Sequence, residues 1–176
     1  SFQKSPASLI FEWETNCSHV RERPYDIQFK ITDRPPYGPN LVEFKNWQIK
    51  IVAPAPKGLD VIPVTGRSSQ LTWDSYSCNN AEKIEIWRRI GSYEFDPDEC
   101  QVGIPDGSGY TLVGEVDANE ILYEDTNSGE GLAPGSKYCY RILSKFPLPE
   151  GGTSYVSEEK CFIVEADAPV ITNVSV

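Results

Sequence analysis

The sequence predicts an all-β protein, and three observations support that prediction. Proline and glycine, with 14 and 13 residues respectively, are spread in small clusters along the chain. Short runs between the clusters alternate apolar and polar residues, as half-buried β-strands do. No window keeps a helical period for three turns. With 176 residues, the chain has room for one large or two small domains of this class.

The most informative run follows a Pro-Gly turn and begins at Lys137. Tyr138 and Tyr140 fall on one face of the expected strand, and Tyr138 comes six residues after Leu132 and four after Pro134. This spacing lets the Tyr138 hydroxyl bond back to the upstream backbone as the chain crosses between two sheets. Such a tyrosine corner is typical of immunoglobulin-like sandwiches, and Leu132, Pro134 and Tyr138 resemble the corner of a fibronectin type III domain. The resemblance implies an immunoglobulin-like β-sandwich.

Residues 59–166 follow the strand order of a fibronectin type III domain around this corner. In that order, Trp73 is the expected buried core indole, and a long excursion over residues 91–109 follows the third strand. The expected strands cover residues 59–64, 69–75, 82–89, 110–116, 121–125, 137–142 and 154–164.

Residues 1–53 are expected to form a second, partial β module. Its strands are predicted at 9–13, 25–32 and 42–51, with a β-bulge or a kink at 45–46 where the alternation slips. The alternating run from Tyr25 to Asp33 resembles the closing half of a PKD- or cadherin-like immunoglobulin-fold module.

A complete sandwich needs roughly 80–100 residues, so half a module leaves an apolar face for a neighbouring module or a second copy to cover. The alternative is that the partial module is what proteolysis leaves of a complete one. Residues 54–58 are expected to be a stiff, proline-containing linker. Residues 167–176 are expected to begin a following module.

Five cysteines, one histidine and no methionine indicate an oxidising, extracytoplasmic setting. If the last two strands form a hairpin, Cys139 and Cys161 face each other on its outer side and can form a disulfide. A second bridge between Cys78 and Cys100 would tie down the long excursion and leave Cys17 unpaired. Free, partly buried thiols are the alternative. Without a Cys-x-x-Cys pair, no zinc site is expected.

Catalytic residues and cofactors are not expected. His19, the one histidine, lies two residues after Cys17, which fits a pair of loop residues better than a nucleophile with its base. Oxygen-bearing side chains alternate at Asp125 and Asn127, as in a calcium loop, but the bidentate glutamate of such a loop is missing. Turn formation is the competing interpretation. The acidic residues at 96–99 are a second calcium candidate.

Trp87 is the best candidate for an exposed binding residue. It is predicted to point outward beside Arg141, where a flat indole can stack on a sugar or a protein partner. The competing interpretation is a cation–π pair in which Arg141 covers the indole. Tyr93 and Phe95 in the excursion also allow two interpretations: their side chains pack within the loop, or they contact a ligand.

The formal charge of −10 is dispersed, which argues against nucleic-acid binding, and no apolar run is long enough to cross a membrane. We therefore predict a non-catalytic spacer, adhesive or protein-interaction segment of a large secreted or cell-surface protein. Its expected partners are neighbouring modules, other proteins or polysaccharide. The modules also resemble tandem repeats of large bacterial surface proteins linked to gliding motility and adhesion. The alternative is a carbohydrate-binding accessory module of a polysaccharide-degrading enzyme.

Overall fold

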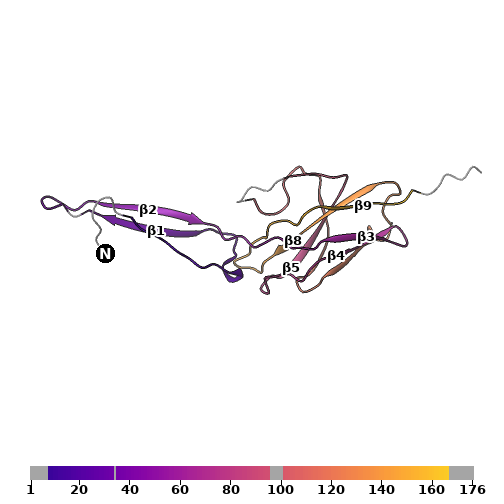
Figure 1. Cartoon of the computed structure of the whole chain (residues 1–176), viewed down its shortest axis with the longest axis horizontal. Coiled ribbons are helices and arrows are strands. Elements are labelled where there is room, and N and C mark those ends of the chain that lie inside the picture. Colours follow the sequence, from indigo (N-terminus) through magenta and orange to yellow (C-terminus); the bar gives the residue numbers. More distant parts are fainter. Residues whose placement is uncertain (1–7, 34, 96–100, 167–176) are drawn as a thin grey trace, which may run out of the picture.

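The structure, a computed structural model, describes residues 8–33, 35–95 and 101–166. This part of the chain is all-β, with three sheets and a single 3-10 turn, η1 (Cys17–His19). A long hairpin extends from a sandwich, and the described chain starts beside the hairpin and ends at the opposite end of the sandwich (Figure 1). Over these residues, no helix is long and apolar enough to cross a membrane.

The sandwich consists of a three-stranded and a four-stranded antiparallel sheet. In the first sheet the order is β3 (Asp60–Val64), β4 (Ser68–Thr72), β7 (Leu122–Asp125). In the second it is β6 (Thr111–Asp117), β5 (Lys83–Ile90), β8 (Lys137–Lys145), β9 (Lys160–Ile163). This arrangement is the immunoglobulin-like sandwich of the fibronectin type III kind, as predicted.

The inward faces of the two sheets form one core. Trp73 is 4% exposed and its indole Nε1 donates to the Glu120 carbonyl at 3.0 Å, as expected for the core indole. The Tyr138 hydroxyl accepts a hydrogen bond from the Ala133 amide at 3.0 Å, and Leu132 is fully buried. The tyrosine corner is therefore present, with Pro134 exposed at its turn.

The strand predicted at 154–164 is regular only in β9. Before β9, two serine hydroxyls replace ladder carbonyls as acceptors for β8 amides. The Ser144 amide donates to Ser154 Oγ at 2.8 Å, and the Ile142 amide donates to Ser157 Oγ at 2.9 Å. Because side chains satisfy these amides, the chain stays beside β8 without a regular ladder.

The hairpin pairs β1 (Tyr25–Thr32) with β2 (Val42–Ile49) in an unbroken antiparallel register. The predicted bulge at 45–46 is therefore wrong. The slip in alternation costs little because almost every β2 residue is exposed, so no core forces one phase on the strand.

Residues 9–13 do not form the predicted strand. They cross one face of the hairpin instead, where the Phe11 ring lies 6.3 Å from the Phe29 ring and the Trp13 ring 4.7 Å from the Tyr25 ring. Phe11 and Trp13 thus pack on the hairpin through their rings rather than through backbone hydrogen bonds.

Candidate functional site

A disulfide between Cys17 and Cys78 joins the base of the hairpin to the sandwich, with a Cα–Cα distance of 5.5 Å. The predicted Cys78–Cys100 bridge is therefore wrong, as is the prediction that Cys17 is unpaired. Cys100 lies outside the described residues. The prediction failed because it treated the cysteines of two modules separately, whereas the fold brings together residues 61 apart in sequence.

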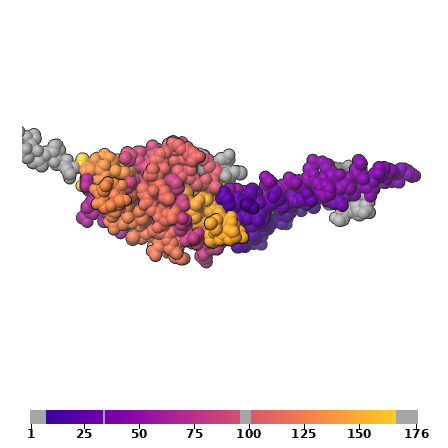
Figure 2. Space-filling view, turned by 180° about the vertical axis from the view of Figure 1, so that it is seen from behind, coloured from indigo at the N-terminus to yellow at the C-terminus, as the bar shows by residue number. Residues whose placement is uncertain are grey.

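A small second core surrounds this disulfide. Its buried members are Val20, Ala53, Cys78 and Phe146. Backbone hydrogen bonds also hold this joint. The Glu22 amide donates to the Glu150 carbonyl at 3.0 Å, and the Tyr155 amide donates to the Ala53 carbonyl at 3.0 Å. Figure 2 shows the yellow-orange loop of the sandwich lying directly against the indigo residues at the base of the hairpin.

The start of the predicted linker at 54–58 is fixed to the sandwich. The Tyr76 hydroxyl donates to the Pro54 carbonyl at 2.8 Å, and Pro56 is buried. On the other side of the joint, a Cβ at Gly152 would lie 3.0 Å from Val20 Cγ1, and the φ of Gly152 is +123°. Only glycine fits this close approach without strain. The joint is therefore a packed, covalently linked contact.

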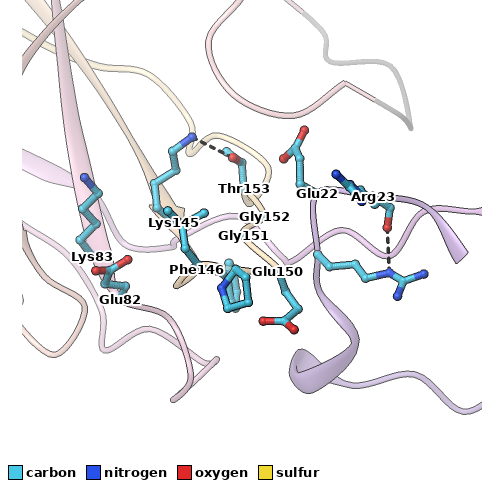
Figure 3. Close-up of a pocket in the computed structure, with 13 residues that line it drawn as sticks. Glu22, Arg23, Glu82, Lys83, Lys145, Phe146, Glu150, Gly151, Gly152 and Thr153 are labelled. Carbon is cyan, nitrogen blue, oxygen red and sulfur yellow. Dashed lines mark hydrogen bonds between the residues drawn. The ribbon is translucent and has the colours of Figure 1, made fainter.

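An open hollow of about 730 Å³ lies beside the joint (Figure 3). Its charges are mixed: Arg21, Arg23, Lys83, Lys145, Glu22, Glu82 and Glu150. Several of these groups are already engaged, since Lys145 Nζ donates to Thr153 Oγ1 at 2.9 Å and Arg21 Nε donates to the Arg23 carbonyl at 2.8 Å. The one aromatic residue of the lining, Phe146, is 5% exposed. The hollow therefore does not present charges of a single sign that could bind an ion, and it has no exposed aromatic ring on which a ligand could stack.

Trp87 and Arg141 lie directly opposite each other on β5 and β8, as predicted. Trp87 is half-buried and its Nε1 donates to Glu85 Oε2 at 3.1 Å. Arg141 is only 7% exposed, and its guanidinium lies 4.6 Å from the centroid of the Phe95 ring rather than over the indole. The predicted Trp87–Arg141 cation–π pair is therefore wrong, because the excursion supplies the aromatic partner.

Glu159 anchors the excursion to the sandwich. Its carboxylate accepts hydrogen bonds from the Ser92 hydroxyl, the Tyr93 amide at 2.9 Å and the Tyr110 hydroxyl. Burial alone would raise the pKa of Glu159, but these hydrogen bonds and the nearby Arg141 cation hold it below its ordinary value. Burial and the bond to Glu159 raise the pKa of Tyr110. Tyr93 and Phe95 thus belong to a tethered loop, in which Phe95 is partly buried and Tyr93 stays 37% exposed.

The Cys139–Cys161 disulfide forms in the predicted register. It lies on the outer side of the four-stranded sheet, where Cys139 is nevertheless 0% exposed. Glu159 lies within 4.8 Å of both sulfur positions. Because both cysteines are oxidised, neither offers a thiolate to a metal ion.

Asp125 and Asn127 direct their oxygens at an internal cation, the Arg88 guanidinium. Arg88 Nη1 donates to both Asp125 carboxylate oxygens, at 2.8 and 3.0 Å, and Arg88 Nη2 donates to Asn127 Oδ1 at 2.8 Å. The Tyr140 hydroxyl also donates to Asp125 at 2.8 Å. The calcium interpretation is therefore wrong: arginine occupies the place that a calcium ion would take. The second calcium candidate, at 96–99, lies outside the described residues.

Arg88 and Glu159 were not predicted as site residues, although the sequence contains signals for both. Arg88 is in phase with the inward-facing Ile84 and Ile86, so a charge in the core should have prompted a search for its partner. Glu159 is two residues before Cys161 and in the same strand phase, which predicts that it lies beside the disulfide.

No protein-family model and no curated protein matches this chain. Among solved structures, titin domains A168–A170 are 19% identical, over 70% of this chain and 37% of that chain, with a TM-score of 0.46. The sixth fibronectin type III domain of human fibronectin type III domain containing protein 3 is 13% identical, over 70% and 96%, with a TM-score of 0.45. The fibronectin type III domain of the human collagen α-1(XX) chain is 11% identical, over 72% of this chain and 94% of that chain, with a TM-score of 0.41.

The chain spans 17% of a further match, titin kinase with its flanking domains. At these identities the likeness concerns the fold alone. The assignment as a fibronectin type III-like sandwich therefore rests on strand order, core and tyrosine corner.

Proposed function

We propose that this chain is a non-catalytic, extracellular spacer or adhesive segment of a large secreted or cell-surface protein. The observation that supports it best is the Cys17–Cys78 bridge, which links the hairpin to the sandwich covalently across a packed joint. A spacer has to hold its modules in line under load, and a disulfide at the joint prevents the two parts from separating. Two disulfides also favour an oxidising compartment outside the cytoplasm.

The modular proposal keeps the boundaries expected from the sequence. Residues 1–53 belong to a PKD- or cadherin-like module, residues 54–58 connect it to a fibronectin type III-like domain at 59–166, and residues 167–176 belong to the next module. The resemblance to tandem repeats of bacterial gliding-motility and adhesion proteins supports a repeating array of such modules. The carbohydrate-binding alternative is weaker, because Trp87 is half-buried and bonded to Glu85.

Single-molecule force spectroscopy tests the spacer function. The chain is placed in series between marker domains and stretched from its ends. The bridges enclose sequence separations of 61 and 22 residues, which cannot extend while the bridges are intact. At about 3.5 Å per residue, reduction should lengthen the stretched chain by roughly 280 Å.

A Cys17→Ser/Cys78→Ser variant lacks the bridge that closes the longer loop, so without reductant it should already show the larger part of that extra length. In the intact chain, force applied at the ends should bypass the hairpin, because the hairpin lies inside the loop that the Cys17–Cys78 bridge closes. If the intact chain extends by the length of that loop without reductant, the spacer proposal fails.

A further inference from the structure

The β1–β2 sheet has two edges without a strand partner within the described residues. An unpaired edge presents backbone N–H and C=O groups to which another strand can bind. A two-stranded sheet is marginally stable in water, and three or more strands that share an apolar face are much more stable. The hairpin therefore gains stability from a strand that extends its sheet.

One face of the hairpin is mostly apolar and incompletely covered, although Lys45 and Glu43 lie on it opposite Phe29 and Ile31. Residues directly opposite in antiparallel strands share a face, so Trp47 lies beside Ile27 on the face that also carries Phe29 and Ile31. The Phe29 and Trp47 ring centroids are 4.7 Å apart. Although residues 8–14 cross this face, Trp47 and Ile31 stay 51% and 50% exposed. In Figure 2 the hairpin projects as a narrow arm, away from the bulk of the sandwich.

The β1 sequence complements itself when it is reversed. When Gln28 is set opposite the partner's Gln28 in an antiparallel pair, Asp26 lies opposite the partner's Lys30. In the same register, Ile27 lies opposite the partner's Phe29. Two-fold symmetry repeats each of these contacts, so two opposite-charge pairs form on one face and two apolar pairs form on the other.

The other edge fits a second copy less well. On β2, the register with Phe44 at the two-fold axis sets Glu43 opposite the partner's Lys45, but those two side chains already bind each other within one strand at 2.6 Å. Net charge also favours contact through the hairpins. Residues 25–49 contain three acidic and three basic residues, whereas the chain carries −10, so hairpins approach without the repulsion that sandwiches would meet.

We propose that two copies of this chain associate through antiparallel pairing of their β1 edges. The product is a four-stranded sheet in the order β2-β1-β1-β2, in which the apolar faces of the two central β1 strands join. Because eight-residue strands bury less than the roughly 800 Å² per partner of a standard interface, the dimer should dissociate at about 10–100 µM. This proposal is independent of the spacer function, since a monomeric chain can still be a spacer.

Sedimentation equilibrium of the oxidised chain, across that concentration range, tests the proposal. Lys30→Asp places like charges opposite each other twice, and should raise the dissociation constant about 10-fold. Adding Asp26→Lys to Lys30→Asp restores both pairs with their signs exchanged, and should recover much of the affinity. Lys45→Asp is the matched control on the β2 edge and should leave the dimer unchanged.

Cross-linking locates the contact independently of charge. In a Cys100→Ser background, Gln28→Cys should be joined to a second copy by a short bis-maleimide, because the two positions meet at the two-fold axis. Gln48→Cys, on the same face but on β2, should not. A chain that stays monomeric at about 1 mM, or a dimer that Lys45→Asp weakens and Lys30→Asp does not, would overturn the proposal.

Discussion

Replacement of Asp125 by alanine should be among the most destabilising single changes in the sandwich. The Asp125 side chain is 3% exposed, and that of its ion-pair partner Arg88 is 17% exposed. The carboxylate accepts two hydrogen bonds from Arg88, one from the Tyr140 hydroxyl and one from the Asn127 amide. Removal of one member of a buried ion pair leaves an uncompensated charge and costs about 3–5 kcal/mol. A domain of this size has a total stability of about 5–15 kcal/mol, so Asp125→Ala should shift its unfolding strongly.

Urea unfolding, followed by tryptophan fluorescence, measures this effect. The urea concentration at the midpoint of unfolding should fall, while the slope of the free energy of unfolding against urea concentration stays unchanged. Arg88→Met alone should also destabilise, because it leaves Asp125 buried without a cation. The double variant should cost less than the sum of the two single changes, since neither charge is then left unpaired. Asp60→Ala, at an exposed position, is the control and should cost less than about 0.5 kcal/mol. The reasoning would be refuted if Asp125→Ala and Arg88→Met each lowered the free energy of unfolding by less than about 1 kcal/mol and their effects simply added. It would also be refuted if calcium stabilised the native chain and Asp125→Ala abolished that stabilisation.

Three further predictions concern other parts of the sandwich. Tyr138→Phe leaves the Ala133 amide without its acceptor, and should cost about 1–3 kcal/mol in the same urea experiment while the circular dichroism spectrum stays native. Gly114→Ala should destabilise by about 1–3 kcal/mol, because its Cβ would lie 2.3 Å from the Tyr123 ring. The pKa of Glu159 is lowered from 4.5 in the folded chain, so the ionised Glu159 carboxylate contributes fully to stability above pH 4.5, and this contribution should be lost as the pH falls through the lower folded pKa. Glu159→Gln should therefore flatten the acid side of the curve of stability against pH. If that side of the curve is unchanged, other carboxyl groups cause the acid sensitivity.

The sandwich could be predicted from sequence because its central strands, such as β4, β5 and β8, contribute buried residues to one core. Burial forces alternation, and the corner spacing from Leu132 to Tyr138 then sets where the chain changes sheets. The β8–β9 register that pairs Cys139 with Cys161 follows from the same alternation. Local pattern was therefore sufficient wherever the core determines the phase of a strand.

The contacts between distant segments could not be predicted in the same way. The Cys17–Cys78 bridge depends on how the 3-10 turn at Cys17–His19 meets the sandwich, and no periodicity within either segment encodes that contact. The partner of Arg141 likewise comes from the excursion, where Phe95 lies in a stretch without alternation. On the exposed hairpin, the slip at 45–46 predicted a bulge that no buried face requires.

Nitrogen-15 relaxation of backbone amides tests most directly the claim that the hairpin and sandwich form one rigid unit. It is measured on the oxidised chain, at a concentration where sedimentation shows a monomer. Amides of β1 and β2 should tumble with the same anisotropic diffusion tensor as amides of β5 and β8, and Cys17→Ser/Cys78→Ser should loosen the hairpin. A shorter correlation time for β1 and β2 than for the sandwich in the oxidised chain would contradict the account.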